Sequence, residues 1–241
     1  MLLMISVLNA SEAREAIVGG ADILDVKNPA EGSLGANFPR VIREIRKISA
    51  PLVKMSAAIG DLPNLPGTAS LAALGAAVSG ADYVKVGLWG PMTEAEAVFL
   101  LREVREAVRD FPNVSVIAAG YADARRSGSL DPQLLPRITL SAGVTGCLLD
   151  TAIKDGCSLF DFLKPEALRA LAEEAHAAGL LYALAGALKE RDLRLVRQIG
   201  ADVVGLRSAA CQEGQRNGPL DVQRVRRLRA ILSRPPQPAG R

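Results

Sequence analysis

The sequence predicts an α/β fold, a single (β/α)8 barrel of the TIM type, and three observations support this prediction. The chain has 241 residues, a common length for one such domain. Hydrophobic residues make up 49% of it, which is enough for a large core. Apolar segments alternate with helical patterns eight times, as in parallel sheets whose strands are covered on both faces. A doubly wound open sheet is the alternative, because pattern alone does not show that a sheet closes.

An internal repeat marks the even-numbered strands. The tripeptide Gly-Ala-Asp occupies residues 20–22, 80–82 and 200–202, and it precedes the apolar segments ILDVK, YVKVG and VVGLR. A degenerate copy begins at Gly143 and precedes GCLLD. Each time a helical pattern ends at glycine, a residue that readily adopts the left-handed conformation found just after a helix. These four segments predict strands 2, 4, 6 and 8.

The remaining elements fill the gaps between these repeats. Apolar segments predict the odd-numbered strands at residues 2–8, 51–59, 113–121 and 180–186. Helical patterns predict helices at about residues 11–19, 39–48, 67–79, 94–110, 131–142, 165–178, 189–199 and 221–232. Pro39, Pro132 and Pro165 stand near three of the helix starts, where proline is tolerated. The barrel is therefore expected to span residues 1–233 without an internal boundary, and the proline-rich tail 234–241 is expected to be disordered.

Composition excludes several classes of function. The net charge is only +3, and a nucleic-acid-binding protein would show a basic stripe with aromatic residues or a known motif, neither of which occurs. The arginines near the C-terminus are interpreted as the solvated face of the last helix. The N-terminal segment MLLMISVL is too short to span a membrane and lacks the basic region and cleavage site of a signal peptide. We therefore expect neither nucleic-acid nor membrane partners.

Cysteine and histidine usage narrows the chemistry. The three cysteines, Cys147, Cys157 and Cys211, are odd in number and lack a metal-binding spacing, which favours a reduced, cytoplasmic protein. The single histidine, His176, lies in a polar and alanine-rich helix and is expected at the surface. Histidine-based triads and histidine-rich zinc sites are therefore not expected, and no metal site is predicted.

Charged residues stand at the ends of the apolar strands, where burial costs free energy and suggests chemistry. They are Asp25, Lys27, Lys85, Asp150 and Lys154. Side chains alternate across a strand, so Asp25 and Lys27 share one face. Aligning the repeats places Asp25 with Lys85, and it places Lys27 with Asp150 and Arg207. Alternate strands contribute to the same layer inside a barrel, so the charged residues of strands 2, 4, 6 and 8 are expected to converge.

Lysine catalysis needs a neutral amine. At a pKa near 10.4 only about 1 lysine in 2,500 is neutral at pH 7, whereas a pKa of about 8 raises the neutral fraction to roughly 10% at a cost of about 3.3 kcal/mol. A second ammonium about 6 Å away supplies on the order of 2.8 kcal/mol at an effective dielectric constant of 20. Paired lysines in a barrel mouth can therefore activate one another. A neighbouring carboxylate has the opposite effect and keeps the ammonium charged.

Each of these residues also has a simpler interpretation. Asp25 and Lys27 would form an inert ion pair, and Lys85 would be a solvated residue at a strand end. Asp150 would cap a turn. Lys154 lies four residues beyond Asp150, so the two would make a helical surface pair that contributes only a few tenths of a kcal/mol.

A phosphate site is predicted at the loops after strands 7 and 8, where barrels often bind phosphate. Gly186 lies in the first of these loops, and Arg207 and Ser208 lie in the second. Small residues expose backbone N–H groups, and a guanidinium can bind an oxyanion through two hydrogen bonds. Ordinary turns are the alternative. Three longer loops, at residues 28–38, 60–67 and 150–164, follow strands 2, 3 and 6 and are expected on the same C-terminal face.

Three segments carry a resemblance to a known family. LDVKNPAEGSLGA, VKVGLWG and LLDTAIKDGCSLFDFL resemble the (5-formylfuran-3-yl)methyl phosphate synthases, and the similarity runs over nearly the whole chain except its tail. The resemblance implies a (β/α)8 barrel that condenses two molecules of glyceraldehyde 3-phosphate early in methanofuran biosynthesis, in a methanogen or methylotroph. The family's Schiff-base lysine falls on Lys27, and its other functional residues fall on Asp25, Lys85, Asp150 and Lys154.

The atom balance of the implied reaction indicates what the enzyme, a lyase, must do. Two triose phosphates lose one phosphate and two waters to give C6H7O6P, so one C–C bond forms and no electrons leave. Lysines and carboxylates suit this chemistry, which requires no metal or redox cofactor. Homo-oligomerisation is expected because it is common among such barrels, although no surface patch in the sequence identifies an interface.

Three other functions stay open. Phosphate-binding decarboxylase barrels also carry an Asp-x-Lys pair, but their pattern has a further aspartate three residues beyond the lysine, where this chain has Ala30. A class I aldolase would cleave and form its bond reversibly. A non-catalytic barrel that binds a phosphorylated ligand would tolerate Lys27→Ala.

Overall fold

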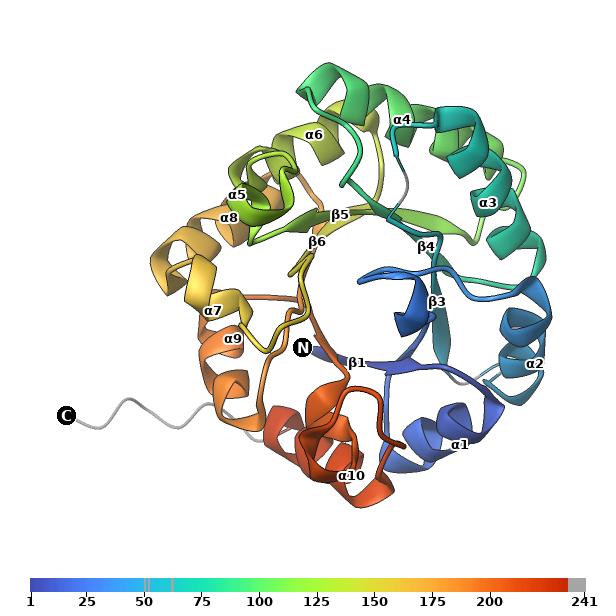
Figure 1. Ribbon diagram of the computed structural model, residues 1–241, viewed down its shortest axis with the longest axis vertical. Coiled ribbons are helices and arrows are strands. Elements are labelled where there is room, and N and C mark those ends of the chain that lie inside the picture. The colour runs from blue at the N-terminus through green and yellow to red at the C-terminus, as the bar shows by residue number, and fades with distance from the viewer. Residues whose placement is uncertain (50, 52, 62, 234–241) are drawn as a thin grey trace.

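The structure is a computed structural model that describes residues 1–49, 51, 53–61 and 63–233. Eight parallel strands form a closed barrel in sequence order, with β8 pairing to β1 (Figure 1). The strands are β1 (Leu2–Val7), β2 (Ile23–Val26), β3 (Lys54–Ala58), β4 (Tyr83–Gly87), β5 (Ser115–Tyr121), β6 (Gly146–Asp150), β7 (Leu181–Leu184) and β8 (Val203–Leu206). The predicted TIM barrel is confirmed, and closure rules out the open doubly wound sheet. The predicted disordered tail, 234–241, lies outside the described residues.

Helices surround the barrel at the predicted positions (Figure 1). They are α1 (Ala10–Gly19), α2 (Pro39–Ser49), α3 (Pro66–Val78), α4 (Glu94–Ala107), α6 (Leu135–Ala142), α8 (Pro165–Ala177), α9 (Leu193–Ile199) and α10 (Val222–Ser233). Two four-residue helices, α5 (Ala124–Ser127) and α7 (Leu159–Phe162), were not predicted. A single helical turn is too short to show a 3.6-residue period, so sequence pattern does not reveal it. None of the described helices is long and apolar enough to cross a membrane.

The Gly-Ala-Asp repeat fixes the entry into three even-numbered strands. Gly20, Gly80 and Gly200 have φ values of 90°, 101° and 98°, the left-handed conformation predicted for them. The aspartates have a role that the sequence did not suggest. Each accepts a hydrogen bond from a backbone N–H of the preceding odd-numbered strand, from Leu3 to Asp22, from Met55 to Asp82 and from Tyr182 to Asp202. The repeat therefore ties neighbouring strands together at the N-terminal face, where barrels place stability rather than catalysis.

Apolar side chains fill the lower interior of the barrel and form the floor beneath the functional site. The main members of this inner layer, Met4, Ile23, Ile117, Leu148, Ala183 and Val203, are all at most 5% exposed. The larger core lies between the outer faces of the strands and the helices. The inner layer excludes water from the N-terminal side of the barrel interior. Charged groups that lie next to it, toward the C-terminal mouth, are therefore poorly solvated.

The loop after β2 crosses the C-terminal mouth of the barrel. Its 3-10 turn η1 (Pro29–Glu31) lies over the barrel opening in Figure 1. The Ser33 hydroxyl donates to the Thr151 carbonyl at 2.8 Å, and the Leu34 N–H donates to the Asp61 carboxylate at 2.9 Å. Asp61 also accepts a hydrogen bond from the hydroxyl of the buried Tyr121. This mouth loop is thus fastened to the loops after β3 and β6.

Candidate functional site

A cavity of about 250 Å³ opens at the C-terminal end of the barrel. All the site residues predicted from the sequence line it, namely Asp25, Lys27, Lys85, Asp150, Lys154, Gly186, Arg207 and Ser208. The predicted convergence of strands 2, 4, 6 and 8 is therefore what the structure shows. Ser6 and Arg216 also line the cavity and were not predicted.

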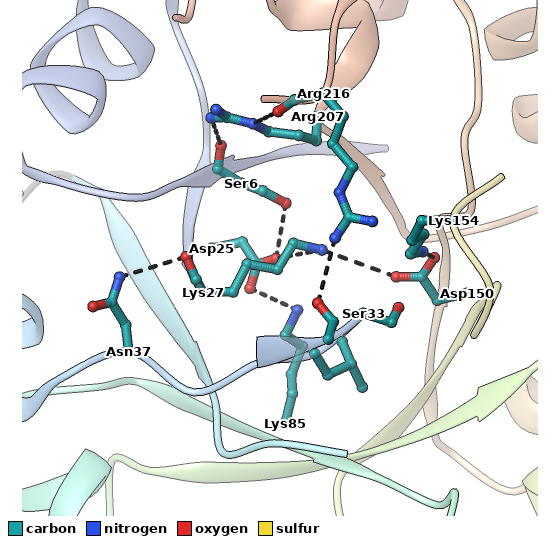
Figure 2. A network of polar contacts seen from close by, with 12 residues as sticks. Ser6, Asp25, Lys27, Ser33, Asn37, Lys85, Asp150, Lys154, Arg207 and Arg216 are labelled. Carbon is teal, nitrogen blue, oxygen red and sulfur yellow. Dashed lines mark hydrogen bonds and ion pairs between the residues drawn. The ribbon is translucent and has the colours of Figure 1, made fainter. Parts of the chain in front are cut away.

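Asp25 lies at the base of the cavity and is 1% exposed. Its carboxylate forms an ion pair with Lys85 Nζ at 2.6 Å, accepts a hydrogen bond from Ser6 Oγ at 3.0 Å, and lies 3.8 Å from Lys27 Nζ (Figure 2). Burial alone would raise the pKa of Asp25, but the ammonium groups of Lys85 and Lys27 outweigh it, and the pKa is lowered. Asp25 is therefore held as a carboxylate between two lysines.

Lys27 lies between two carboxylates at the centre of the site (Figure 2). Its Nζ is 3.8 Å from Asp25 and 4.0 Å from Asp150. Burial lowers the pKa of Lys27 to about 8 even though both carboxylates act to raise it. Lys85 also lowers this pKa, as expected for paired lysines, but its effect is smaller than that of burial. At pH 7 roughly a tenth of such an amine is neutral, compared with about 1 in 2,500 for an ordinary lysine.

Asp150 joins Lys27 to Lys154. Lys154 Nζ lies 2.6 Å from the Asp150 carboxylate and 3.2 Å from Thr151 Oγ1. Burial would raise the pKa of Asp150, but Lys154 and Lys27 hold it well below its usual range. The Thr151 N–H also donates to Asp150 at 2.7 Å, so this aspartate caps the turn in addition to its place in the site.

The helical surface pair considered for Asp150 and Lys154 is not found. The segment 151–158 contains no helix, and Lys154 is turned into the cavity rather than out to solvent. Five charged groups consequently form a continuous series in which ammonium and carboxylate alternate. Its members in order are Lys85, Asp25, Lys27, Asp150 and Lys154.

The loops after β7 and β8 form the opposite wall. Gly186 has a φ of 99° and Ala187 a φ of 49°, so two successive residues are in the left-handed region. A Cβ atom on Gly186 would lie 3.1 Å from the Thr151 side chain, which makes glycine the fitting residue at this close approach. Ser208 faces the same cavity from the β8 loop. The small side chains of these loops let a ligand approach the backbone closely.

Arg207 does not offer a free donor to a ligand. Two of its N–H groups form a bidentate ion pair with Glu12, at 2.6 and 2.9 Å, and the other three donate to the backbone carbonyls of Ser6, Arg216 and Gly218. All five guanidinium donors are thereby used. The prediction that Arg207 binds an oxyanion directly is therefore revised, because its role here is to hold the loop 211–220 against the barrel.

Sequence reasoning missed three polar residues for different reasons. Glu12 follows the Asn9 cap in the first turn of α1, where an acidic residue is ordinary, yet it is 8% exposed. Arg216 lies in an irregular segment without periodicity. Ser6 could have been found, because it stands beside Asp25 in the register of β1 with β2.

His176 lies at the surface, as predicted, with its ring 3.0 Å from the Asp202 carboxylate. Among the described residues, no group of three or more histidine, cysteine, aspartate or glutamate side chains is arranged to hold a metal ion. The polar groups that face the cavity are ammonium, guanidinium, hydroxyl and carboxylate groups.

The chain is similar to one family of proteins over nearly its whole length. A family model described as 4-HFC-P synthase matches residues 3–229. Two relatives are named (5-formylfuran-3-yl)methyl phosphate synthase. The protein from Methanocaldococcus jannaschii is 51% identical over 96% of this chain and 99% of its own length. The protein from Methanobrevibacter smithii is 54% identical over 90% of this chain and 92% of its own length. A 3-hexulose-6-phosphate synthase structure superposes with a TM-score of 0.66 at 20% identity over 95% of this chain and 99% of that one, a likeness that shows the fold alone.

Proposed function

Because the chain belongs to the 4-HFC-P synthase family, we propose that it condenses two molecules of glyceraldehyde 3-phosphate into (5-formylfuran-3-yl)methyl phosphate through an imine on Lys27. The observation that carries the proposal is the position of Lys27, a buried amine with a pKa of about 8 between two carboxylates in a cavity. The proposed product is that named for the relatives, and the proposed pathway is methanofuran biosynthesis.

The first step uses the neutral fraction of Lys27. Its amine attacks the aldehyde carbon of one triose phosphate, and the resulting carbinolamine loses water to give a protonated imine. This cation occupies the place of the original ammonium, within reach of Asp25 and Asp150. Two carboxylates already oriented toward a developing positive charge stabilise it without reorganisation.

The protonated imine then acts as an electron sink. A proton leaves the adjacent carbon to a carboxylate, and the electron pair that is released expels phosphate from the next carbon. Lys85 and Asp25, paired at 2.6 Å, are suited to move this proton. The Asp25 carboxylate can accept a proton, and the Lys85 ammonium can donate one. The imine-bound carbon chain next adds to the aldehyde of the second triose, and further dehydration and ring closure give the furan.

Asp150 and Lys154 are assigned to the later steps. Lys154 is a positioned proton donor beside Asp150, which suits it to protonate a departing hydroxyl. The loops that contain Gly186 and Ser208 are assigned to the phosphate that the product retains. Arg207 supports this wall through its contacts with Glu12 and the backbone.

The reaction is tested by incubating the purified protein with glyceraldehyde 3-phosphate and analysing the products by mass spectrometry. We expect a species of composition C6H7O6P and one free phosphate for every two trioses consumed. Unchanged triose phosphate in a folded sample would refute the proposed reaction. A reversible aldol product would indicate an aldolase, and binding without turnover would indicate a non-catalytic barrel.

The imine is tested separately by reduction with borohydride in the presence of substrate. We expect a stable adduct that peptide mapping places on Lys27. Lys27→Arg keeps the positive charge but cannot form the imine, so it should abolish both the adduct and turnover. Lys54→Arg, at an exposed lysine on β3, is the matched control and should behave like the wild type. Substantial activity in Lys27→Arg would contradict the assignment.

A further inference from the structure

Arg216 occupies a distinctive position above the site. It lies in the irregular segment between the paired residues Cys211 and Leu220, and its guanidinium points down into the cavity toward Lys27 (Figure 2). The guanidinium makes a long hydrogen bond, from Nη2 to the carbonyl of Gly32 at 3.5 Å. Most of its five donors therefore face the cavity without an acceptor in the described part of the chain.

Arg216 has no carboxylate in ion-pair contact among the described residues, in contrast to the other cations of the site, and Asp150 and Asp61 act on its charge only from farther away. Lys27, Lys85, Lys154 and Arg207 each have a carboxylate within 4.0 Å, whereas Arg216 has none there. The side chain is partly buried, and burial lowers the pKa of its guanidinium. A partly desolvated guanidinium without an anion in direct contact costs free energy, which points to an anion that arrives from outside.

The protein fixes this arginine in place. Arg207 Nε donates to the carbonyl of Arg216 at 2.9 Å, and Arg207 Nη2 donates to that of Gly218 at 3.0 Å. The Gln212 N–H donates to the Pro219 carbonyl at 3.0 Å and closes the base of the segment. Arg207 is itself anchored by its buried ion pair with Glu12. The backbone of Arg216 is therefore tied to the barrel through this ion pair.

The charge balance of the site calls for a further cation. Three lysines against two aspartates leave one positive charge in the series described above, and Glu12 neutralises Arg207. A phosphate monoester carries about −1.5 to −2 at pH 7, and two triose phosphates bring two of them. The loop around Gly186, residues 185–188, contains no charged side chain to balance them.

We propose that Arg216 is a substrate-binding residue that grips the phosphate group of a triose phosphate through charge-assisted hydrogen bonds. The planar fork of a guanidinium matches phosphate oxygens in a way that a lysine ammonium does not. The identity of the substrate rests on the proposed function, whereas the anion site itself rests on the geometry of Arg216. Arg216 also touches Gly32 of the mouth loop, so a bound phosphate would lie beneath that loop.

The test compares Arg216→Gln and Arg216→Lys with the wild type. Arg226→Gln, which removes the same charge from an exposed position on α10, is the matched control. We expect Arg216→Gln to raise the KM for glyceraldehyde 3-phosphate, and the Kd for inorganic phosphate measured by calorimetry, by roughly ten- to a hundredfold. Arg216→Lys should recover part of this loss, and Arg226→Gln should show none. Thermal unfolding checks that each variant is folded.

Unphosphorylated glyceraldehyde separates phosphate recognition from a structural effect. Borohydride trapping of this aldehyde on Lys27 should be equal in the wild type and in Arg216→Gln, because Arg216 recognises only the phosphate. An unchanged KM together with an unchanged phosphate Kd in Arg216→Gln would overturn the proposal. The proposal would also fail if this variant trapped glyceraldehyde and glyceraldehyde 3-phosphate on Lys27 with equally reduced yields. If the wild type makes no furan, the proposed function fails, and the phosphate Kd of Arg216→Gln still decides the role of Arg216.

Discussion

Lys27→Met tests the electrostatics of the site through protein stability rather than through activity. Methionine has a similar length and no charge, and Lys27 is only 6% exposed, so the substitution removes a buried ammonium with little change in packing. The pKa of Lys27 is about 8 in the folded protein and 10.5 without its surroundings. Because the folded-state pKa is the lower one, the protonated side chain opposes folding.

The magnitude follows from the difference between these two pKa values. Below pH 8 the full penalty applies, and a lowering from 10.5 to about 8 corresponds to roughly 3 kcal/mol. As the pH rises from 8 to 10.5, the side chain becomes neutral in the folded and then in the unfolded state, and the penalty disappears. Lys27→Met should therefore be more stable than the wild type by roughly 3 kcal/mol at pH 6.5, and by less than half as much at pH 9.5.

The assay is urea unfolding of both proteins at several pH values between 6.5 and 9.5. The informative quantity is the change with pH of the difference in unfolding free energy, since contributions shared by the two proteins cancel. Lys47→Met, at an exposed lysine of α2, is the control and should give a difference that does not change with pH. If Lys27→Met were less stable than the wild type at pH 6.5, or if its advantage did not fall with pH, the inference that burial outweighs the two carboxylates would be wrong.

Two further substitutions test the supports of the site. Arg207→Met leaves Glu12 buried without its partner, so we expect urea unfolding to show a loss of about 3–5 kcal/mol, much of which Glu12→Gln in the same chain should restore. Gly87→Ala would bring a Cβ within 2.6 Å of the Tyr121 hydroxyl and 2.7 Å of Asp61, so we expect it to cost about 1–3 kcal/mol and to lower turnover by displacing the mouth loop. Wild-type stability in either single variant would contradict the contacts described.

The fold was predictable because its signals are local and repeated. Each Gly-Ala-Asp copy places a helix end and a strand start within a few residues, and the structure keeps those boundaries at β2, β4 and β8. Closure was not predictable, because it depends on β8 pairing with β1 across nearly the whole chain. The hydrogen bonds from the preceding strands to Asp22, Asp82 and Asp202 were equally hidden, since pattern shows a polar residue but not its partner.

The site likewise contains residues that could be predicted from sequence and residues that could not. Residues at fixed positions in the strand repeat, such as Lys27 and Asp150, could be brought together by the alternation of side chains alone. Arg207 obeyed the same register and faces the cavity, yet its function depended on Glu12, which reaches it from a helix 195 residues away. Arg216 lies outside the strands, in an irregular segment, so the alternation of side chains could not predict which way it points. Sequence periodicity therefore finds which side chains converge, and only the three-dimensional contacts show which of them remain free for a ligand.

The pKa of Lys27 reflects a compromise between two steps of the proposed reaction. A lysine buried without carboxylates would be neutral more often and would attack the aldehyde more readily. The same pocket would then disfavour the protonated imine, which carries the positive charge that draws electrons from the neighbouring carbons. Asp25 and Asp150 raise the pKa of Lys27 and so slow the first step, but they stabilise the cation on which the later steps depend. A pKa of about 8 lets the amine react at neutral pH while the site keeps its preference for positive charge.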